Sequence, residues 1–68
     1  MPIISVVIAE GRTSEKKRNF IRALTKAAVE AMDVRPEQVR VILQETSLEH
    51  FAVAGVTFAE SSERDARA

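Results

Sequence analysis

The chain has 68 residues, with ten basic side chains, ten acidic side chains, one histidine and no cysteine. A chain of this length buries only about 60% of the surface that its unfolded form exposes, so it usually needs a disulfide, a metal ion or association with other chains. The lack of cysteine excludes a disulfide, and one histidine without a carboxylate cluster argues against a metal site. Association with other chains is the remaining route. The balanced charge argues against nucleic-acid binding.

The sequence also indicates where the protein works. No apolar run approaches the roughly 20 residues of a membrane span, and the N-terminus lacks the basic and apolar regions of a signal peptide. A chain without cysteine suits a reducing compartment. We therefore expect one domain over residues 1–68, in the cytoplasm, with neither a membrane nor a nucleic acid as partner.

Residues 3–8 predict a strand that is apolar on both faces. Ile3 and Val7 flank Ser5 on one face. The opposite face carries Ile4, Val6 and Ile8. A glycine and charged residues at 9–12 then predict a loop at the carboxyl end of this strand.

An amphipathic helix is predicted next, capped by Thr13 or Ser14 and ended before Pro36. Its apolar positions recur at helical spacing: Lys17, Phe20, Ile21, Leu24, Ala27, Ala28 and Ala31, with the stem of Lys17 counted among them. The basic run at 16–18 resembles a nucleic-acid stripe, but the solvated face of a helix explains it better in a chain without net charge. Residues 33–38 form the return loop.

Residues 39–45 predict a second strand, and a strand, a crossover helix and a second strand form a right-handed βαβ unit with parallel pairing. One face of the second strand carries Val39, Val41 and Leu43, and the other carries Arg40, Ile42 and Gln44. One helix covers only one face of such a sheet, and a two-stranded sheet with a bare apolar face is not stable alone. We therefore expect an oligomer, for example through edge pairing of two protomers into a four-stranded sheet.

The rest of the chain is short. Residues 46–50 predict a polar turn that contains His50, and residues 51–58 predict either a short hairpin or an arm on a neighbouring subunit. The polar stretch at 61–68 is expected to fray. The fold class is thus a small α/β domain of the α+β type: a βαβ unit with a short C-terminal hairpin, completed by oligomerisation.

Pro2 lies directly before the first strand and has two interpretations. It can simply begin an edge strand, where its missing N–H does no harm. If Met1 is removed, Pro2 instead provides a free secondary amine among apolar side chains. Burial disfavours a charged amine, so its pKa should fall below the value of about 8 for a free α-amine, and a neutral amine can act as a base.

Four features in this order resemble the 4-oxalocrotonate tautomerase family: Pro2 behind the initiator, Glu10-Gly11-Arg12 after the first strand, Val39-Arg40-Val41-Ile42 in the second, and His50-Phe51 after it. The resemblance runs from Pro2 to about Gly55. It departs from the family in the hairpin, where Ala52-Val53-Ala54-Gly55 replaces a segment usually richer in glycine.

The resemblance implies an isomerase without a cofactor, which interconverts the keto and enol forms of a 2-hydroxydienoate or 2-oxo acid such as 2-hydroxymuconate, in aromatic degradation. It implies that Pro2 is the general base and that Arg12 binds the distal carboxylate of a small-molecule carboxylate substrate. Arg40 would bind the reacting end and stabilise the developing charge. Phe51 would keep the pocket apolar. The implied assembly is a homo-oligomer built from dimers, commonly a hexamer.

Other interpretations of the same residues are an exposed loop position for Arg12, an interface ion pair for Arg40 and a core position for Phe51. A related hydratase is less consistent with the sequence, because Ala52 and Val53 stand where such enzymes carry a glutamate. A non-catalytic βαβ oligomer is the third alternative, since a retained Met1 would convert the Pro2 nitrogen into an amide.

Overall fold

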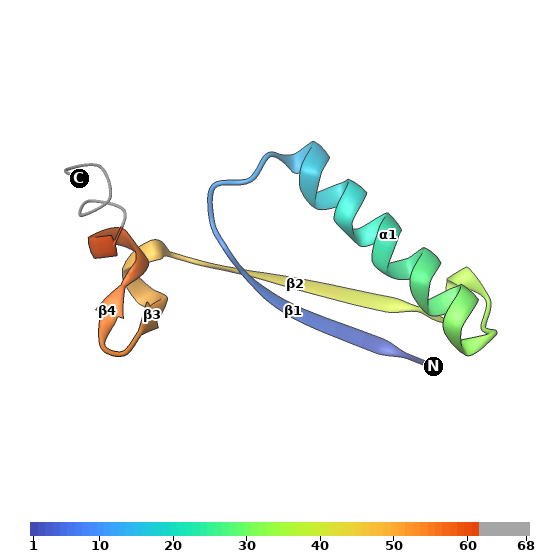
Figure 1. Ribbon diagram of the computed structural model, residues 1–68. Coiled ribbons are helices and arrows are strands. Elements are labelled where there is room, and N and C mark those ends of the chain that lie inside the picture. The colour runs from blue at the N-terminus through green and yellow to red at the C-terminus, as the bar shows by residue number, and fades with distance from the viewer. Residues whose placement is uncertain (62–68) are drawn as a thin grey trace.

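The computed structural model describes residues 1–61 and contains the predicted βαβ unit followed by a small hairpin (Figure 1). Strand β1 spans Ile3–Ala9, helix α1 spans Ser14–Met32 and strand β2 spans Arg40–Thr46. Two short 3₁₀-helices, Pro36–Gln38 and Leu48–His50, precede and follow β2, and the hairpin strands are β3, Ala52–Val53, and β4, Val56–Thr57. The predicted fold class is confirmed.

Strands β1 and β2 pair in parallel, as predicted, with Ile3 opposite Arg40 and Ala9 opposite Thr46. The ladder begins one residue later than expected. The Val39 N–H donates to the carbonyl of Pro36 at 3.1 Å, so Val39 closes the 3₁₀-turn instead of joining the sheet. Beyond the last pair, the Glu10 N–H donates to the Thr46 carbonyl at 3.0 Å, which continues the pairing into the loop.

Helix α1 begins and ends through local interactions. The Thr13 hydroxyl accepts a hydrogen bond from the Lys16 N–H at 3.2 Å, so Thr13 is the N-cap, one of the two residues predicted for this role. The helix ends at Met32 because Asp33 adopts a left-handed conformation, with φ 54°, before the extended Arg35 and Pro36. The end before Pro36 is confirmed.

The helix packs on one face of the sheet only (Figure 1). The covered face carries half-buried side chains, namely Ile4, Val6, Ile8, Val41 and Leu43. Ala28 of α1 is the most deeply buried residue of the described chain, with 9% exposure. On the other face Ile3, Val7 and Ile42 are 60%, 55% and 49% exposed. The bare apolar face expected from one crossover helix is therefore present.

The hairpin lies beyond the end of β2, away from α1 (Figure 1). Val53 pairs with Val56, so Ala54 and Gly55 form a two-residue loop. Their φ angles of 54° and 80° are those of a type I′ turn, whose twist matches a tight hairpin. The predicted hairpin is confirmed, although it ends before Phe58.

Residues 58–61 form a helical turn where the sequence predicted the end of the hairpin. The Thr57 N–H donates to Glu60 Oε2 at 2.9 Å, and the Glu60 N–H donates to Thr57 Oγ1 at 3.2 Å. This reciprocal pair is a capping box, which starts a helix at Thr57. The fraying expected at 61–68 falls, from residue 62 on, outside the described residues. Within residues 1–61, no helix combines the length and the hydropathy needed to span a bilayer.

The bare face of the sheet leads to the first prediction. Ile42 lies at its centre, opposite Ser5, and Ile42→Asp would place a charge where a second copy is expected to pack. Because burying an unpaired charge costs several kcal/mol, this variant should sediment as a smaller species than the wild type. Ala23→Asp, on the outer face of α1, is the matched control and should keep the wild-type sedimentation. A wild-type protein that remains a folded monomer at micromolar concentration would contradict the prediction.

Candidate active site

Pro2 and Arg40 lie together at the edge of the sheet where both strands begin. The Arg40 N–H donates to the Pro2 carbonyl at 3.0 Å, and Ile3 pairs with Arg40 in the ladder. The Arg40 guanidinium donates through Nη1 to the Glu37 carbonyl at 2.8 Å, which ties it to the 3₁₀-turn before β2. Most of its N–H donors remain available for a ligand. This edge of the sheet therefore combines the candidate base with a cation.

Arg12 lies at the opposite edge, in the loop that follows β1. Its Nη1 donates to the Ala9 carbonyl at 3.0 Å, and the side chain is otherwise exposed. Because β1 has seven residues at about 3.3 Å each, a strand about 23 Å long separates Pro2 from the loop that carries Arg12. One chain alone cannot bring Arg12 to Pro2.

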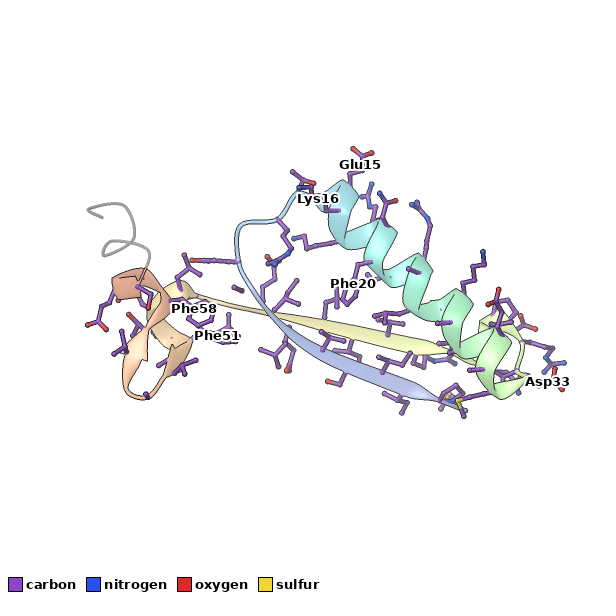
Figure 2. The ribbon with its side chains drawn as sticks, in the orientation of Figure 1. Glu15, Lys16, Phe20, Asp33, Phe51 and Phe58 are labelled. Atoms are coloured by element: carbon purple, nitrogen blue, oxygen red, sulfur yellow. The ribbon has the colours of Figure 1, made fainter. Side chains whose placement is uncertain are left out.

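Phe51 also lies at the far edge, after the end of β2. Its ring packs against Phe58, with centroids 4.5 Å apart and planes inclined by 43° (Figure 2). The Phe58 N–H donates to the Phe51 carbonyl at 2.7 Å, so the ring contact and a backbone bond hold the base of the hairpin together. Of the four predicted site residues, one chain thus joins Pro2 with Arg40 and leaves Arg12 and Phe51 at the other edge.

A hollow of about 310 Å³ lies beside Arg12, between the β1–α1 loop and the first turns of the helix. It is lined by Ile8, Arg12, Lys16, Lys17 and Phe20. Lys17 Nζ forms an ion pair with Glu45 Oε1 at 2.8 Å, which joins α1 to the end of β2.

The sequence analysis counted Lys17 at the apolar spacing and explained the basic run at 16–18 by the solvated face of the helix; Lys16 and Arg18 are exposed and Lys17 is half-buried. Lys16 and Lys17 line the hollow, whereas Arg18 does not. The position of Lys16 beside the hollow could have been predicted from its spacing to Phe20, because residues four apart lie on the same face of a helix. The contact between Lys17 and Glu45 joins residues 28 positions apart, so no local pattern could have revealed it.

The model of the tautomerase enzyme family matches residues 2–61. This chain belongs to that family. A probable tautomerase of Ralstonia nicotianae is 46% identical to it over the whole length of both chains. A 2-hydroxymuconate tautomerase of Bacillus subtilis is 40% identical over 81% of this chain and 89% of its own length.

Solved structures agree with this assignment. A 4-oxalocrotonate tautomerase isozyme of Methylibium petroleiphilum superposes with a TM-score of 0.86 at 51% identity, covering 98% of this chain and all of its own. A heterohexameric 4-oxalocrotonate tautomerase of Chloroflexus aurantiacus superposes with a TM-score of 0.85 at 40% identity, covering 88% of this chain and 97% of its own. The tautomerase is thus an isomerase, as the resemblance implied, and the roles of its individual site residues remain predictions.

The hairpin that follows Phe51 contains a strained position, which yields the second prediction. Ala54 has a φ of 54°, a conformation that costs most residues about 1–2 kcal/mol and that Asn tolerates. Asn-Gly is also the preferred pair of a type I′ turn. Ala54→Asn should therefore increase the free energy of unfolding by about 0.5–1 kcal/mol in denaturant titrations. Ala52→Asn makes the same substitution in the extended backbone of β3 and should not increase the free energy of unfolding. Equal increases in both variants would refute the explanation by relief of strain at Ala54.

Proposed function

We propose that this tautomerase interconverts the enol and keto forms of a 2-hydroxydienoate dicarboxylate of the 2-hydroxymuconate type, in the cytoplasm and in aromatic degradation. The reaction requires a base that both removes and returns a proton, together with cations for a substrate with a carboxylate at each end. The adjacency of Pro2 and Arg40 at one edge of the sheet is the observation that carries the proposal. The names of the curated relatives supply the substrate class.

Pro2 is the proposed general base once Met1 has been removed. Met1 is 75% exposed at the free end of β1, so an aminopeptidase can reach the Met1–Pro2 bond. The product has a secondary amine at the start of an apolar strand. Contact with apolar side chains disfavours the charged amine, so the pKa of the Pro2 amine should be below that of a free α-amine. A neutral amine can then accept a proton near neutral pH.

The proposed reaction moves one proton from oxygen to carbon and needs no cofactor. The Pro2 nitrogen accepts the proton of the 2-hydroxyl group, the oxygen–hydrogen electron pair becomes the carbonyl π bond, and the conjugated electrons shift along the chain. The ammonium then returns a proton to a carbon of the diene. Arg40 stabilises the negative charge that develops on the oxygen during this transfer. Arg12 binds the distal carboxylate throughout.

The site is proposed to form between subunits of a homo-oligomer built from dimers, up to a hexamer. In one chain Pro2 lies at the start of β1 and Arg12 follows its end. If the β1 strands of two copies paired side by side in antiparallel orientation, the start of one β1 would lie beside the end of the other. The bare face with Ile3, Val7 and Ile42 is available for further copies. Phe51 of a neighbouring hairpin would then cover the base and exclude water.

The two arginines should have different kinetic effects, which is the third prediction. Arg12→Ala should mainly raise KM, by about ten- to a hundredfold, because a charge-assisted hydrogen bond is lost in the ground state and the transition state alike. Arg40→Ala should also lower kcat, by about a hundredfold, because Arg40 meets charge that appears during the reaction. Steady-state turnover of 2-hydroxymuconate measures both.

Arg22→Ala is the matched control, because Arg22 bonds to Asn19 on the helix exterior, away from the proposed site residues. Its kinetic constants should equal those of the wild type. If neither Arg12→Ala nor Arg40→Ala changes dicarboxylate turnover while Pro2→Ala abolishes it, the arginine assignments are wrong.

The fourth prediction concerns pH. Because the neutral amine is the active form, kcat/KM should rise with pH through an apparent pKa below about 8 and approach its plateau near neutrality. Phe51→Ala would admit water, which favours the charged amine, so the rising limb should move to higher pH. A pH–rate profile of both proteins and ¹⁵N titration of the Pro2 nitrogen measure the shift, with the N-terminus verified by mass. Full activity of protein that retains Met1 would exclude Pro2 as the base.

A further inference from the structure

The hollow beside Arg12 has a polar wall of three cations and an apolar floor. Arg12, Lys16 and Lys17 provide the charge, and Ile8 and Phe20 provide the apolar surface. Figure 2 shows Lys16 on the first turn of α1 and Phe20 one turn further, on the side of the helix that faces the sheet. A ligand that matches this hollow has an anionic end and an apolar chain.

The three cations differ in what they can offer to a ligand. Lys17 is paired with Glu45 at 2.8 Å, so its charge is largely neutralised. Neither Arg12 nor Lys16 forms an ion pair with an acidic side chain within residues 1–61. Two positive charges therefore remain at the hollow, on Arg12 and Lys16.

Local hydrogen bonds fix the backbone that carries these two side chains, which line the same hollow. The Thr13 hydroxyl accepts from the Lys16 N–H at 3.2 Å, and the Thr13 carbonyl accepts from the Lys17 N–H at 3.1 Å. Arg12 directly precedes Thr13, and its guanidinium donates to the Ala9 carbonyl at 3.0 Å. A guanidinium has several further donors, so this bond leaves Arg12 able to bind a carboxylate.

We infer that Lys16 is a specificity-determining residue, which binds the distal carboxylate of the substrate together with Arg12. This inference deepens the proposed function and rests on its assignment of Arg12. A carboxylate has two oxygens and several lone pairs, so it can accept from the guanidinium and the ammonium at once. A substrate without the distal carboxylate gains nothing from Lys16. The second cation therefore selects dicarboxylates over monocarboxylates.

The fifth prediction tests Lys16 with a matched pair of variants on the full chain. Lys16→Gln and Arg18→Gln remove the same charge from the same exposed helix turn, but only Lys16 lines the hollow. The substrates are 2-hydroxymuconate and the corresponding 2-hydroxydienoate without the distal carboxylate. Lys16→Gln should lower the ratio of their kcat/KM values by about two- to fivefold, because the lost contact is an exposed charge pair. Lys16→Arg should restore the ratio.

A binding measurement provides a readout that does not need turnover. Adipate, an unreactive six-carbon dicarboxylate, should shift the backbone amide signals of Arg12 and Lys16 in ¹H–¹⁵N spectra. Its apparent dissociation constant should rise about two- to fivefold in Lys16→Gln and remain unchanged in Arg18→Gln. Added salt should weaken the wild-type interaction, since it screens exposed charges. Inorganic phosphate, which has no apolar chain, should bind more weakly than adipate.

The outcomes separate this inference from the proposed function. Normal turnover of 2-hydroxymuconate with an unchanged ratio in Lys16→Gln would overturn the role of Lys16 alone. Equal losses in Lys16→Gln and Arg18→Gln would show a general charge effect and would also overturn it, as would phosphate binding as tightly as adipate. Adipate binding that depends on Lys16, in a protein that does not convert 2-hydroxymuconate, would support the dicarboxylate site and refute the proposed reaction.

Discussion

One crossover helix can cover only one face of a two-stranded parallel sheet, and much of this structure depends on that constraint. Helix α1 packs on the face with Ile4 and Val41, so the opposite face remains open although it carries Ile3, Val7 and Ile42. An isolated two-stranded sheet with such a face is not expected to be stable in water. We therefore expect the same apolar residues that make β1 a strand to pack against a partner chain.

Parallel pairing divides the proposed site into two halves. The starts of β1 and β2 meet at one edge, where Pro2 lies beside Arg40, and their ends meet at the other, where Arg12 and Phe51 lie. The first half carries the candidate base and the cation for the reacting end. In the proposed mechanism the second half carries the cations that bind the remote end of the substrate. We therefore expect the site to assemble together with the oligomer.

Short-range hydrogen bonds position the charged side chains of both halves. The 3₁₀-turn before β2 accepts from the Arg40 guanidinium through Glu37, and the Ala9 carbonyl does the same for Arg12. The N-cap Thr13 sets the first turn of α1 and with it Lys16. Each of these contacts joins residues three positions apart, so all of them form within one chain.

The sequence alone determined the elements of this fold, because period-two alternation, helical spacing, Pro36 and the cap at Thr13 are local signals. It also identified the residues that resemble the tautomerase motif. The sequence analysis did not predict the helical turn at 58–61, although Thr57 and Glu60 have the three-residue spacing of a capping box. Only the tertiary structure decided that Glu45 neutralises Lys17 and leaves Arg12 and Lys16 without an acidic partner within residues 1–61, because the contact between Lys17 and Glu45 joins residues 28 positions apart.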